Sequence, residues 1–258
     1  LPVGRIVEAV DGVARRLLDE GDPLRAEAMA TVAFFSGYSK AMVQEVVDGM
    51  ARGWTAESLW ALIRSEFPFP GALDGLVPVA GGRQVRAMGF PLSFHLGAGT
   101  VPGVATTSLV RSLLVKSGAL LKPGLGDVAL PVLFARGLEE ADPELGRCVA
   151  ILYWPGEERD TTRSVLAGVD LVVAYGSDET VTWVRRNLPA HTAFKAYRHR
   201  MGFVLIGREV MTRGSSGDKE GDALAVARGT ARAVALFDQQ GCVSPHAVLV
   251  ERGGEIAP

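Results

Sequence analysis

The segment FDQQGCVSPHAVLVE at residues 237–251 places a cysteine, Cys242, between a helical pattern and an apolar, strand-like run. A thiol at such a turn can stand clear of the backbone, and Gln239, Gln240 and nearby amides could donate hydrogen bonds towards it. A partly ionised thiol in that setting is a nucleophile. We therefore expect Cys242 to act as a nucleophile; the alternative is a small, buried and inert hydrophobe.

The other cysteine and three of the histidines suit chemistry less well. Cys148 lies in the apolar run RCVAILYW, which predicts a buried, unreactive thiol. His95 falls in an apolar strand and is expected in the core. His199 and His246 are candidate bases; the alternative for His199 is a histidine that satisfies strand-edge hydrogen bonds, and the alternative for His246 is a packing residue. The cysteines lack the spacing of a zinc site, so no metal is expected.

Four turns rich in Gly, Pro or polar residues follow strand-like runs, at residues 97–103, 122–127, 154–158 and 175–179. The first, GAGTVPG, has the spacing GxGxxxG and fits either an ordinary tight turn or a cofactor loop. Lys122, followed by proline, is placed to reach a ribose hydroxyl or phosphate, or is a solvated loop cation. Ser177 or Asp178 caps a helix whose first amides can face a phosphate or a nicotinamide ring.

The elements that must hold these turns alternate between strand and helix. Strands are expected at 91–97, 119–122, 148–154, 170–175, 192–197 and 203–207, and helices at 104–116, 127–140, 159–167 and 178–187. This rhythm predicts an α/β fold with a Rossmann-like parallel sheet covered on both faces. In such a sheet the ligand lies beyond the carboxyl ends of the strands, where the turns are.

Residues 5–65 carry helical periodicity in several short segments, with an apolar stripe through Ile6, Val10, Val13, Leu17 and Leu18. Asp22-Pro23, Ser39 and Thr55 predict the starts of further helices. The aromatic residues of this region are expected in its core: Phe34, Phe35, Tyr38 and Trp60. We divide the chain into a helical N-terminal region (1–84), a nucleotide-binding domain (85–211) and the start of a catalytic domain (212–258), with a flexible linker at 212–221.

The composition is that of a globular protein: 258 residues, 48% hydrophobic and 22% charged, with a formal net charge of −2. This balance argues against nucleic acid as a partner. No apolar run reaches the roughly 18 residues of a membrane span. Two cysteines favour a reducing compartment, and we expect a cytoplasmic protein. There is no signal peptide, and a chain that begins at Leu1 is expected to lack its native N-terminus.

Taken in order, the motifs resemble the aldehyde dehydrogenase superfamily over residues 85–258. GTVP at Gly99–Pro102 occupies the place of the superfamily's Asn loop, and KPGL at Lys122–Leu125 matches its KPSE-like segment. AYGSD at Ala174–Asp178 matches its FTGST turn, and DQQGC at Asp238–Cys242 matches its nucleophile segment. Through FDQQGCVSPH, AYGSDETV, LYWPG and SGYSKAMV the chain is most similar to long-chain acyl-CoA reductases, which include the fatty-acid reductase subunit of bacterial bioluminescence.

The resemblance implies reduction of an acyl-CoA or acyl-protein thioester to an aldehyde with NADPH, or with NADH as the alternative, through an acyl-cysteine at Cys242. The amide of Cys242 and a side chain of the 97–103 loop would form the oxyanion hole, with Thr100 in place of the usual Asn. The implied cofactor residues are Gly99, Pro102, Lys122, Gly176 and Ser177.

Two alternatives stay open. The first is an oxidative aldehyde dehydrogenase, but KAYRHRMGFVLIG lacks the carboxylate that such enzymes carry in the comparable stretch. The second is a non-catalytic nucleotide-binding domain of an acyl-transfer complex. It is supported by the short stretch after Cys242, which leads us to expect a fragment. The resemblance also implies an acyl-protein synthetase partner and a homo-oligomer, either a dimer or a tetramer.

Overall fold

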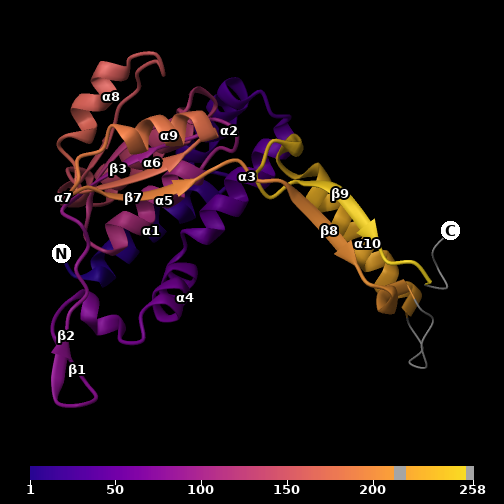
Figure 1. The fold of residues 1–258 in the computed structure, drawn as a ribbon, viewed down its shortest axis with the longest axis horizontal. Helices are drawn as coiled ribbons and strands as arrows, with labels where there is room; N and C mark the ends of the chain where they lie inside the picture. Colours follow the sequence, from indigo (N-terminus) through magenta and orange to yellow (C-terminus); the bar gives the residue numbers. More distant parts are fainter. Residues whose placement is uncertain (212–218, 254–258) are drawn as a thin grey trace. The chain divides into compact units, whose positions relative to one another are not determined.

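A computed structural model describes residues 1–211 and 219–253, in two compact units, Leu1–Arg198 and His199–Pro258. The first unit (unit 1) is built on a five-stranded sheet, and its strands are β3 (Leu92–Leu96), β4 (Gly118–Lys122), β5 (Val149–Ile151), β6 (Leu171–Tyr175) and β7 (Ala193–Tyr197). The strands are all parallel, in the order β5-β4-β3-β6-β7 (Figure 1). The predicted Rossmann-like α/β fold is confirmed.

The connections place the switch point of the sheet between β3 and β6. Helices α5 (Val104–Leu114) and α6 (Ala129–Ala141) lead from β3 through β4 to β5, and α8 (Arg159–Leu166) and α9 (Asp178–Arg186) lead from β5 through β6 to β7. Val181 and Val184 of α9 join the apolar cluster around Phe94 on one face, while α5 packs on β3 and β4. Ligands of doubly wound sheets bind in the crevice at such a switch point.

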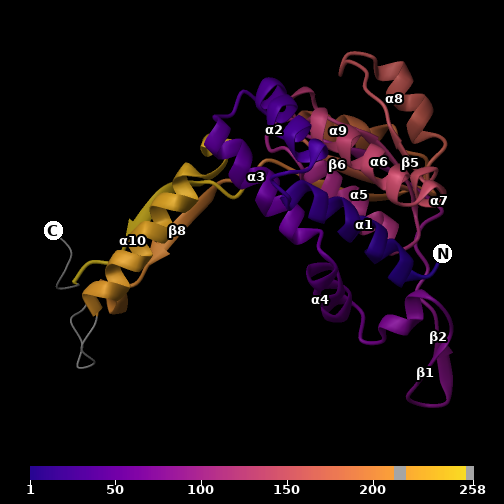
Figure 2. The same ribbon diagram turned by 180° about the vertical axis from the view of Figure 1, so that it is seen from behind.

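The helical N-terminal region consists of α1 (Val3–Leu18), α2 (Pro23–Ser36), α3 (Lys40–Gly53), α4 (Ala56–Glu66) and a short 3₁₀ turn, η1 (Pro70–Leu73) (Figure 2). Asp22 and Ser39 accept hydrogen bonds from the amides of Leu24 and Met42, so both predicted caps are confirmed. Thr55 precedes α4, but its hydroxyl donates to the carbonyl of Arg52 and makes no cap bond.

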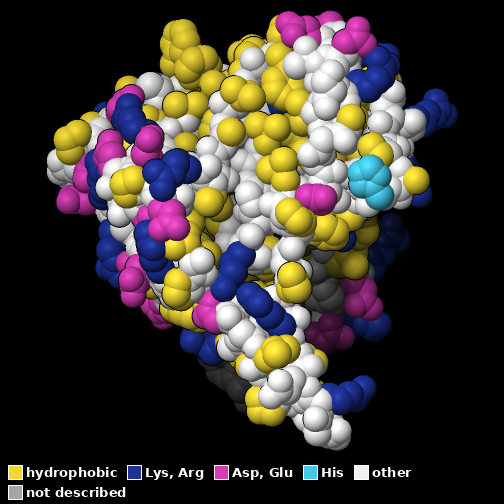
Figure 3. Space-filling model, turned by 90° about the vertical axis from the view of Figure 1, so that its left-hand side faces the viewer, with side chains coloured by type: hydrophobic (Ala, Val, Ile, Leu, Met, Phe, Trp, Pro, Cys, Tyr) yellow, Lys and Arg dark blue, Asp and Glu magenta, His cyan; other side chains and the backbone are white. Residues whose placement is uncertain are grey.

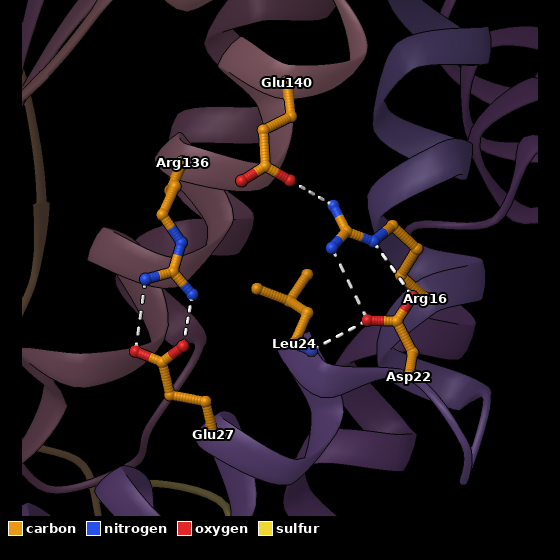
Figure 4. Close-up of polar contacts among 6 residues, drawn as sticks. All are labelled: Arg16, Asp22, Leu24, Glu27, Arg136 and Glu140. Carbon is orange, nitrogen blue, oxygen red and sulfur yellow. Dashed lines mark hydrogen bonds and ion pairs between the residues drawn. The ribbon is translucent and has the colours of Figure 1, made fainter.

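Ion pairs join this helical region to α6 of the sheet layer (Figure 4). Arg16 of α1 contacts Asp22 at 3.0 Å and Glu140 of α6 at 2.6 Å, and Arg136 of α6 pairs with Glu27 of α2. These pairs are partly exposed, so each contributes little energy. Close apolar packing of α6 on α1 and α2 contributes more to stability. At Gly137 of α6 a Cβ would lie 3.2 Å from Val13 and 3.3 Å from Leu24.

The aromatic prediction for this region is wrong in part. Tyr38 is buried and Trp60 half-buried, but Phe34 is 81% exposed and Phe35 39% exposed. The buried side of α2 runs through Leu24, Ala28 and Val32, which are spaced four residues apart. Phe34 lies off that stripe, whereas Phe35, three residues after Val32, lies on it but belongs to the last turn of α2 and stays partly exposed.

The amino edge of the sheet also differs from the sequence-based expectations. A short helix, α7 (Pro143–Gly146), precedes β5, and a hairpin of β1 (Val77–Val79) and β2 (Arg83–Val85) was not predicted. Because β5 begins only at Val149, Cys148 is exposed, and its thiol donates to the carbonyl of Glu144 at 3.5 Å. The prediction of a buried Cys148 is therefore wrong. Figure 3 looks onto this edge, where hydrophobic side chains gather beside mixed charges.

The turns after β3 and β4 touch through their backbones. A Cβ at Gly99 would lie 2.9 Å from the amide nitrogen of Gly126, and one at Gly124 would lie 2.3 Å from the amide nitrogen of Gly99. The amide of Gly97 also donates to the carbonyl of Lys122 at 2.8 Å. Side chains at Gly99 or Gly124 would force the turns apart. The main role of these glycines is therefore to let the two backbones lie in contact.

The second unit (unit 2) contains η3 (Arg208–Met211), α10 (Lys219–Ala235), η4 (Leu236–Gln239) and a parallel pair of strands, β8 (Gly202–Ile206) and β9 (Pro245–Val250). The predicted linker at 212–221 falls mainly outside the described residues, and its last three residues already belong to α10. Across both described stretches, no helix has the length and hydropathy to cross a membrane.

His95 of β3 lies in the core, as predicted, and is 1% exposed. Its ring nitrogens contact three hydroxyls, Nε2 those of Ser93 at 3.1 Å and Ser112 at 3.0 Å, and Nδ1 that of Ser108 at 2.8 Å. Burial lowers the pKa of His95 to about 4. The imidazole is therefore a neutral part of the packing between β3 and α5 at physiological pH.

We predict that Gly124→Ala lowers the free energy of unfolding by about 1–3 kcal/mol, because the new methyl group meets backbone that cannot turn aside. Gly156→Ala is the matched control, since a Cβ at Gly156 has no neighbour within 4 Å. Urea unfolding of the two variants measures the difference. Equal stability of the two would contradict the close contact of the turns.

We also predict that acid weakens the fold through His95. Its pKa is 6.5 when unfolded and about 4 when folded, so stability is lost as the pH falls from about 6.5 towards 4. Between pH 7 and pH 5 this amounts to about 2 kcal/mol. Urea unfolding at both values should show a smaller loss for His95→Gln than for the wild type. The exposed His191, changed to Gln, should leave the loss unaltered.

Candidate functional site

A pocket of about 270 Å³ opens at the carboxyl edge of the sheet, beside the switch point. Strand ends and turns after β3, β4, β5 and β6 form it with residues of α8 and α9: Leu96, Gly97, Ala98, Lys122, Gly156, Thr162, Tyr175, Gly176, Thr180, Trp183 and Val184. The pocket is small for a dinucleotide and fits one of its two halves. Its position is the one that the parallel sheet predicts for a nucleotide.

Among the described residues that line this pocket, Lys122 is the only cation. It ends β4 with 8% of its surface exposed, and its Nζ lies 5.6 Å and 5.5 Å from the ring centroids of Tyr153 and Trp154. Burial lowers the pKa of Lys122, and the charge of Glu157 partly opposes that effect. Lys122 is therefore no solvated loop cation. A desolvated ammonium gains most from an anion placed beside it.

Trp183 of α9 forms an aromatic wall of the pocket. The guanidinium groups of Arg159 and Arg163 lie 5.5 Å and 6.0 Å from its ring. Beneath it, Trp154 donates its indole N–H to the buried hydroxyl of Thr162 at 2.8 Å. A flat apolar wall next to a cation is suited to a base and the phosphate or ribose attached to it.

Thr100 lies in the turn after β3, of which Gly97 and Ala98 line the pocket. Its side chain is exposed, and its carbonyl accepts a hydrogen bond from the hydroxyl of Tyr38 at 2.6 Å. Pro102 is buried beneath the turn and is not among the pocket-lining residues. Thr100 thus remains a candidate donor, whereas the observed role of Pro102 is packing.

Asp127 supports the same turn from below. It is 1% exposed, and its Oδ1 accepts the amide of Gly103, the residue that begins α5, at 2.9 Å. Among the described residues, Oδ2 has no hydrogen-bond partner. Burial raises the pKa of Asp127 to about 8, against the opposing effect of the α5 amides of Gly103 and Ala105. The carboxyl group therefore ties the turn after β4 to the start of α5 from within the protein.

The turn after β6 carries Gly176 and Ser177. Gly176 lines the pocket, and Ser177 caps α9 by accepting the amide of Thr180 at 3.2 Å, as one of the two predicted caps. The next residues, Asp178 and Glu179, are exposed carboxylates in the first turn of α9. Negative charge in the first turn competes with an anionic ligand for the helix terminus. This lessens the case for a phosphate at Ser177.

Cys242 is the exposed corner of a tight turn in unit 2. The amide of Ser244 donates to the carbonyl of Gly241 at 2.9 Å, which closes a turn with Cys242 and Val243 at its tip. The turn lies between η4 and β9, as the sequence predicts. Ahead of it, Phe237, Asp238 and Gln239 have φ values of 61°, 47° and 63°. Three successive non-glycine residues in the left-handed region mark stored backbone strain, which is common beside nucleophiles.

The donors expected around Cys242 are placed differently from the prediction. Nε2 of Gln239 donates to the carbonyl of Val234 at 2.6 Å and to that of Pro245 at 3.4 Å, so this amide holds the turn together. His246 is exposed on β9, and His199 is exposed outside any strand. Packing, the alternative for His246, is therefore not its observed role, and His199 does not lie on a strand whose edge it could serve.

The predicted site residues fall into two groups. Lys122 and Gly176 line one pocket, with the turn of Gly99 and Thr100 at its edge, while Cys242 belongs to unit 2. In the described ranges 1–211 and 219–253, no three His, Cys, Asp or Glu side chains are grouped to hold a metal ion.

Sequence reasoning missed much of the pocket wall. Tyr175, Trp183 and Thr162 line it, and Asp127 braces it. Tyr175 begins the predicted turn at 175–179, but the sequence assigns its side chain no role. Trp183 and Thr162 lie in mid-helix, where only the packing of α8 on α9 reveals a shared pocket.

Known proteins resemble the chain over nearly its whole length. The sequence profile of the acyl-CoA reductase (LuxC) family matches residues 1–258. Long-chain acyl-protein thioester reductase 2 of Photobacterium leiognathi is 23% identical over 95% of this chain and 49% of its own length. The long-chain acyl-protein thioester reductase of Aliivibrio fischeri is 25% identical over 96% of this chain and 50% of its own. The chain thus spans about half the length of these relatives.

Solved structures share the fold. Succinic semialdehyde dehydrogenase of Streptococcus pyogenes, in complex with NADP+, has a TM-score of 0.70 at 15% identity, over 96% of this chain and 50% of that one. An aldehyde dehydrogenase of Bartonella henselae has a TM-score of 0.69 at 16% identity, over 98% and 49%. The predicted aldehyde dehydrogenase type of fold is confirmed. With the profile match over all 258 residues, the chain belongs to the acyl-CoA reductase (LuxC) family.

Proposed function

We propose that the protein containing this chain reduces a long-chain acyl thioester, carried on CoA or on a protein, to the fatty aldehyde with NADPH. The observation that carries the proposal is the exposed thiol of Cys242 at the tip of a turn that follows three left-handed residues, in a chain of the acyl-CoA reductase family. The names of the curated relatives support the acyl-protein thioester as substrate.

Cys242 supplies the nucleophile. Its thiolate attacks the thioester carbonyl, the carbon–sulfur bond to the carrier breaks, and the carrier thiol leaves with a proton. The acyl group is then held on Cys242 as a new thioester. A bound nicotinamide cofactor supplies the hydride that reduces this acyl carbon. Hydride addition would give a tetrahedral oxyanion, which collapses directly: the carbonyl re-forms as the free aldehyde, and the carbon–sulfur bond breaks to release the Cys242 thiolate.

Thr100 is the proposed side-chain donor to the oxyanion. Its exposed hydroxyl stands on a turn held on three sides: by Tyr38 at its own carbonyl, by Asp127 at Gly103, and by the glycine contact below it. Preorganised donors stabilise developing charge because they need no reorganisation during reaction. We assign the second donor to the amide of Cys242.

Lys122 is the proposed ligand of the cofactor's ribose or its 2′-phosphate. In dinucleotide folds an Asp or Glu after the second strand selects NAD, whereas a cation accommodates NADP. Here β4 ends on Lys122, and Leu125 in the same turn is exposed and uncharged. This supports NADPH over NADH. Glu157 opposes a preference for NADPH, because its negative charge interacts with Lys122 and would repel a 2′-phosphate. Gly176 lines the same pocket. Gly99, Pro102 and Ser177 are further proposed cofactor-binding residues, in the turns that follow β3 and β6.

An acyl-protein synthetase as acyl donor and a homo-oligomer are further parts of the proposal that rest on the family alone.

Incubation of the intact protein with acyl-CoA, without cofactor, should add one acyl mass, because nothing reduces the acyl-cysteine. Cys242→Ser should show no such mass under the same conditions. Mass spectrometry of the intact protein and its peptides makes the measurement. Cys148→Ser is the matched control, since Cys148 is also an exposed free thiol. Acylation that persists in Cys242→Ser and vanishes in Cys148→Ser would overturn the assignment.

Cofactor choice should respond to charge at the pocket. We predict that Lys122→Met raises the KM for NADPH by about tenfold, or about 1.4 kcal/mol, and that for NADH by less, because a phosphate contact is lost. Glu157→Gln should lower the KM for NADPH. Steady-state kinetics with both cofactors gives the ratio, and Lys116→Met, remote from the pocket and paired with Asp74, is the control. An equal change for both cofactors would argue that Lys122 binds the ribose.

A further inference from the structure

A buried carboxyl group in the turn after β4 has only one of its two oxygens bonded. Asp127 ends the 3₁₀ turn η2 (Leu125–Asp127) and is almost fully buried. Its Oδ1 accepts the amide of Gly103 at 2.9 Å, but none of the described residues donates to Oδ2, which is also buried. A carboxylate closed off from both water and donors is costly, whereas the neutral acid carries no charge to desolvate.

Within the described part of the chain, no cation offsets a charge on Asp127. Burial raises its pKa to about 8, and only the amides of Gly103 and Ala105 act against burial. Asp127 is therefore mostly the neutral acid at pH 7. Helices α2 and α6 pack against η2, and α5 begins beside it. The charged side chains of these elements and of the turn are engaged elsewhere or exposed: Arg25 with Asp48, Glu27 with Arg136, Glu140 with Arg16, Lys122 over Tyr153 and Trp154, and the exposed Glu139 and Arg111.

The bond from Gly103 joins this acid to the turn that carries Thr100. Gly103 is the N-cap of α5, with a φ of 89°, and has no side chain with which to cap the helix. Asp127 supplies the acceptor for the amides of Gly103 and Ala105 from another turn. Thr100 lies three residues before Gly103, and its carbonyl is held by Tyr38. Movement of Asp127 would therefore displace one end of the segment that presents the Thr100 hydroxyl.

We propose that Asp127 is a proton-controlled positioning residue: with its carboxyl group protonated it holds the turn of Thr100 in place for the oxyanion, and without the proton it releases that turn. This rests on the proposed function, and it adds a residue that touches neither the acyl group nor the cofactor. Ionisation places a negative charge where no cation meets it, so the turn must open to water before the charge is solvated. The Thr100 hydroxyl is then no longer preorganised.

The pH dependence of acyl transfer follows from two groups with opposite effects. Ionisation of the Cys242 thiol speeds the attack on the thioester as the pH rises. Loss of the proton from Asp127 slows the same step. With a pKa of about 8, the neutral fraction of Asp127 falls from about nine tenths at pH 7 to about one tenth at pH 9.

The test measures how fast acyl-CoA acylates Cys242 in the intact protein, without cofactor, at pH 7 and at pH 9. Quenched samples are analysed by mass spectrometry. Asp127→Asn keeps the shape of the side chain and cannot ionise, so the ratio of the wild-type rate to the variant rate should fall about tenfold between the two pH values. The ratio removes the contribution of the thiol. Asp142→Asn is the matched control: Arg5 lowers the pKa of Asp142, which is ionised throughout, so its ratio should stay constant.

Thr100→Val shows whether Asp127 acts through the hydroxyl. In that background Asp127→Asn should no longer alter the pH dependence, because the group that Asp127 positions is gone. The ratio of the wild-type rate to the Thr100→Val rate should also fall from pH 7 to pH 9, and this comparison needs no change at Asp127 should Asp127→Asn fail to fold.

Two results overturn the inference while leaving the proposed function intact. One is acylation of Cys242 with a constant ratio of wild type to Asp127→Asn, and the other is a fall of that ratio that persists in the Thr100→Val background. Absence of acylation of Cys242 in the wild type at both pH values refutes the proposed function, and the inference with it.

Discussion

The candidate cofactor site depends on a contact between two pieces of backbone. Gly99 of the turn after β3 meets Gly124 and Gly126 of the turn after β4, at distances that leave no room for a Cβ. Thr100 follows this contact directly, Lys122 precedes it by two residues, and Asp127 closes the second turn onto α5. Strands β3 and β4 are fixed by their hydrogen bonds, but the ends that emerge from the sheet are placed by this contact. The helical region then secures the same turn from outside through Tyr38.

Much of unit 1 was predictable because its signals are local. Alternating strand and helix patterns require parallel strands, and Asp22, Ser39 and Ser177 cap helices through bonds to amides two or three residues away. The errors occurred where a boundary or a tertiary contact decides. Cys148 is exposed because β5 starts one residue later than expected, and Phe34 is exposed because it lies off the buried stripe of α2.

For the candidate site, the sequence predicted the turns that follow the strands but not the helix residues that line the pocket. Lys122, Gly176 and the turn from Gly97 follow strands, so the rule for parallel sheets locates them without coordinates. Trp183 and Thr162 come together only when α8 packs beside α9, and no spacing in the sequence states that. GAGTVPG fitted either an ordinary tight turn or a cofactor loop, and the first role of Gly99 is to let the two turns touch. The sequence assigned no role to Gly124 or Gly126, which form the other half of this contact. A glycine-rich motif indicates positions where no side chain fits. Only the fold shows whether a ligand or another stretch of backbone lies against those positions.

The exposure of both free cysteines has a practical consequence for chemical probes of this protein. Maleimides, iodoacetamide and disulfide reagents modify accessible thiols, so a labelling stoichiometry near two would not by itself report on Cys242. Loss of activity on alkylation would be equally ambiguous. Titration with such reagents becomes interpretable once the thiol beside α7 has been replaced, or once the labelled peptides are separated.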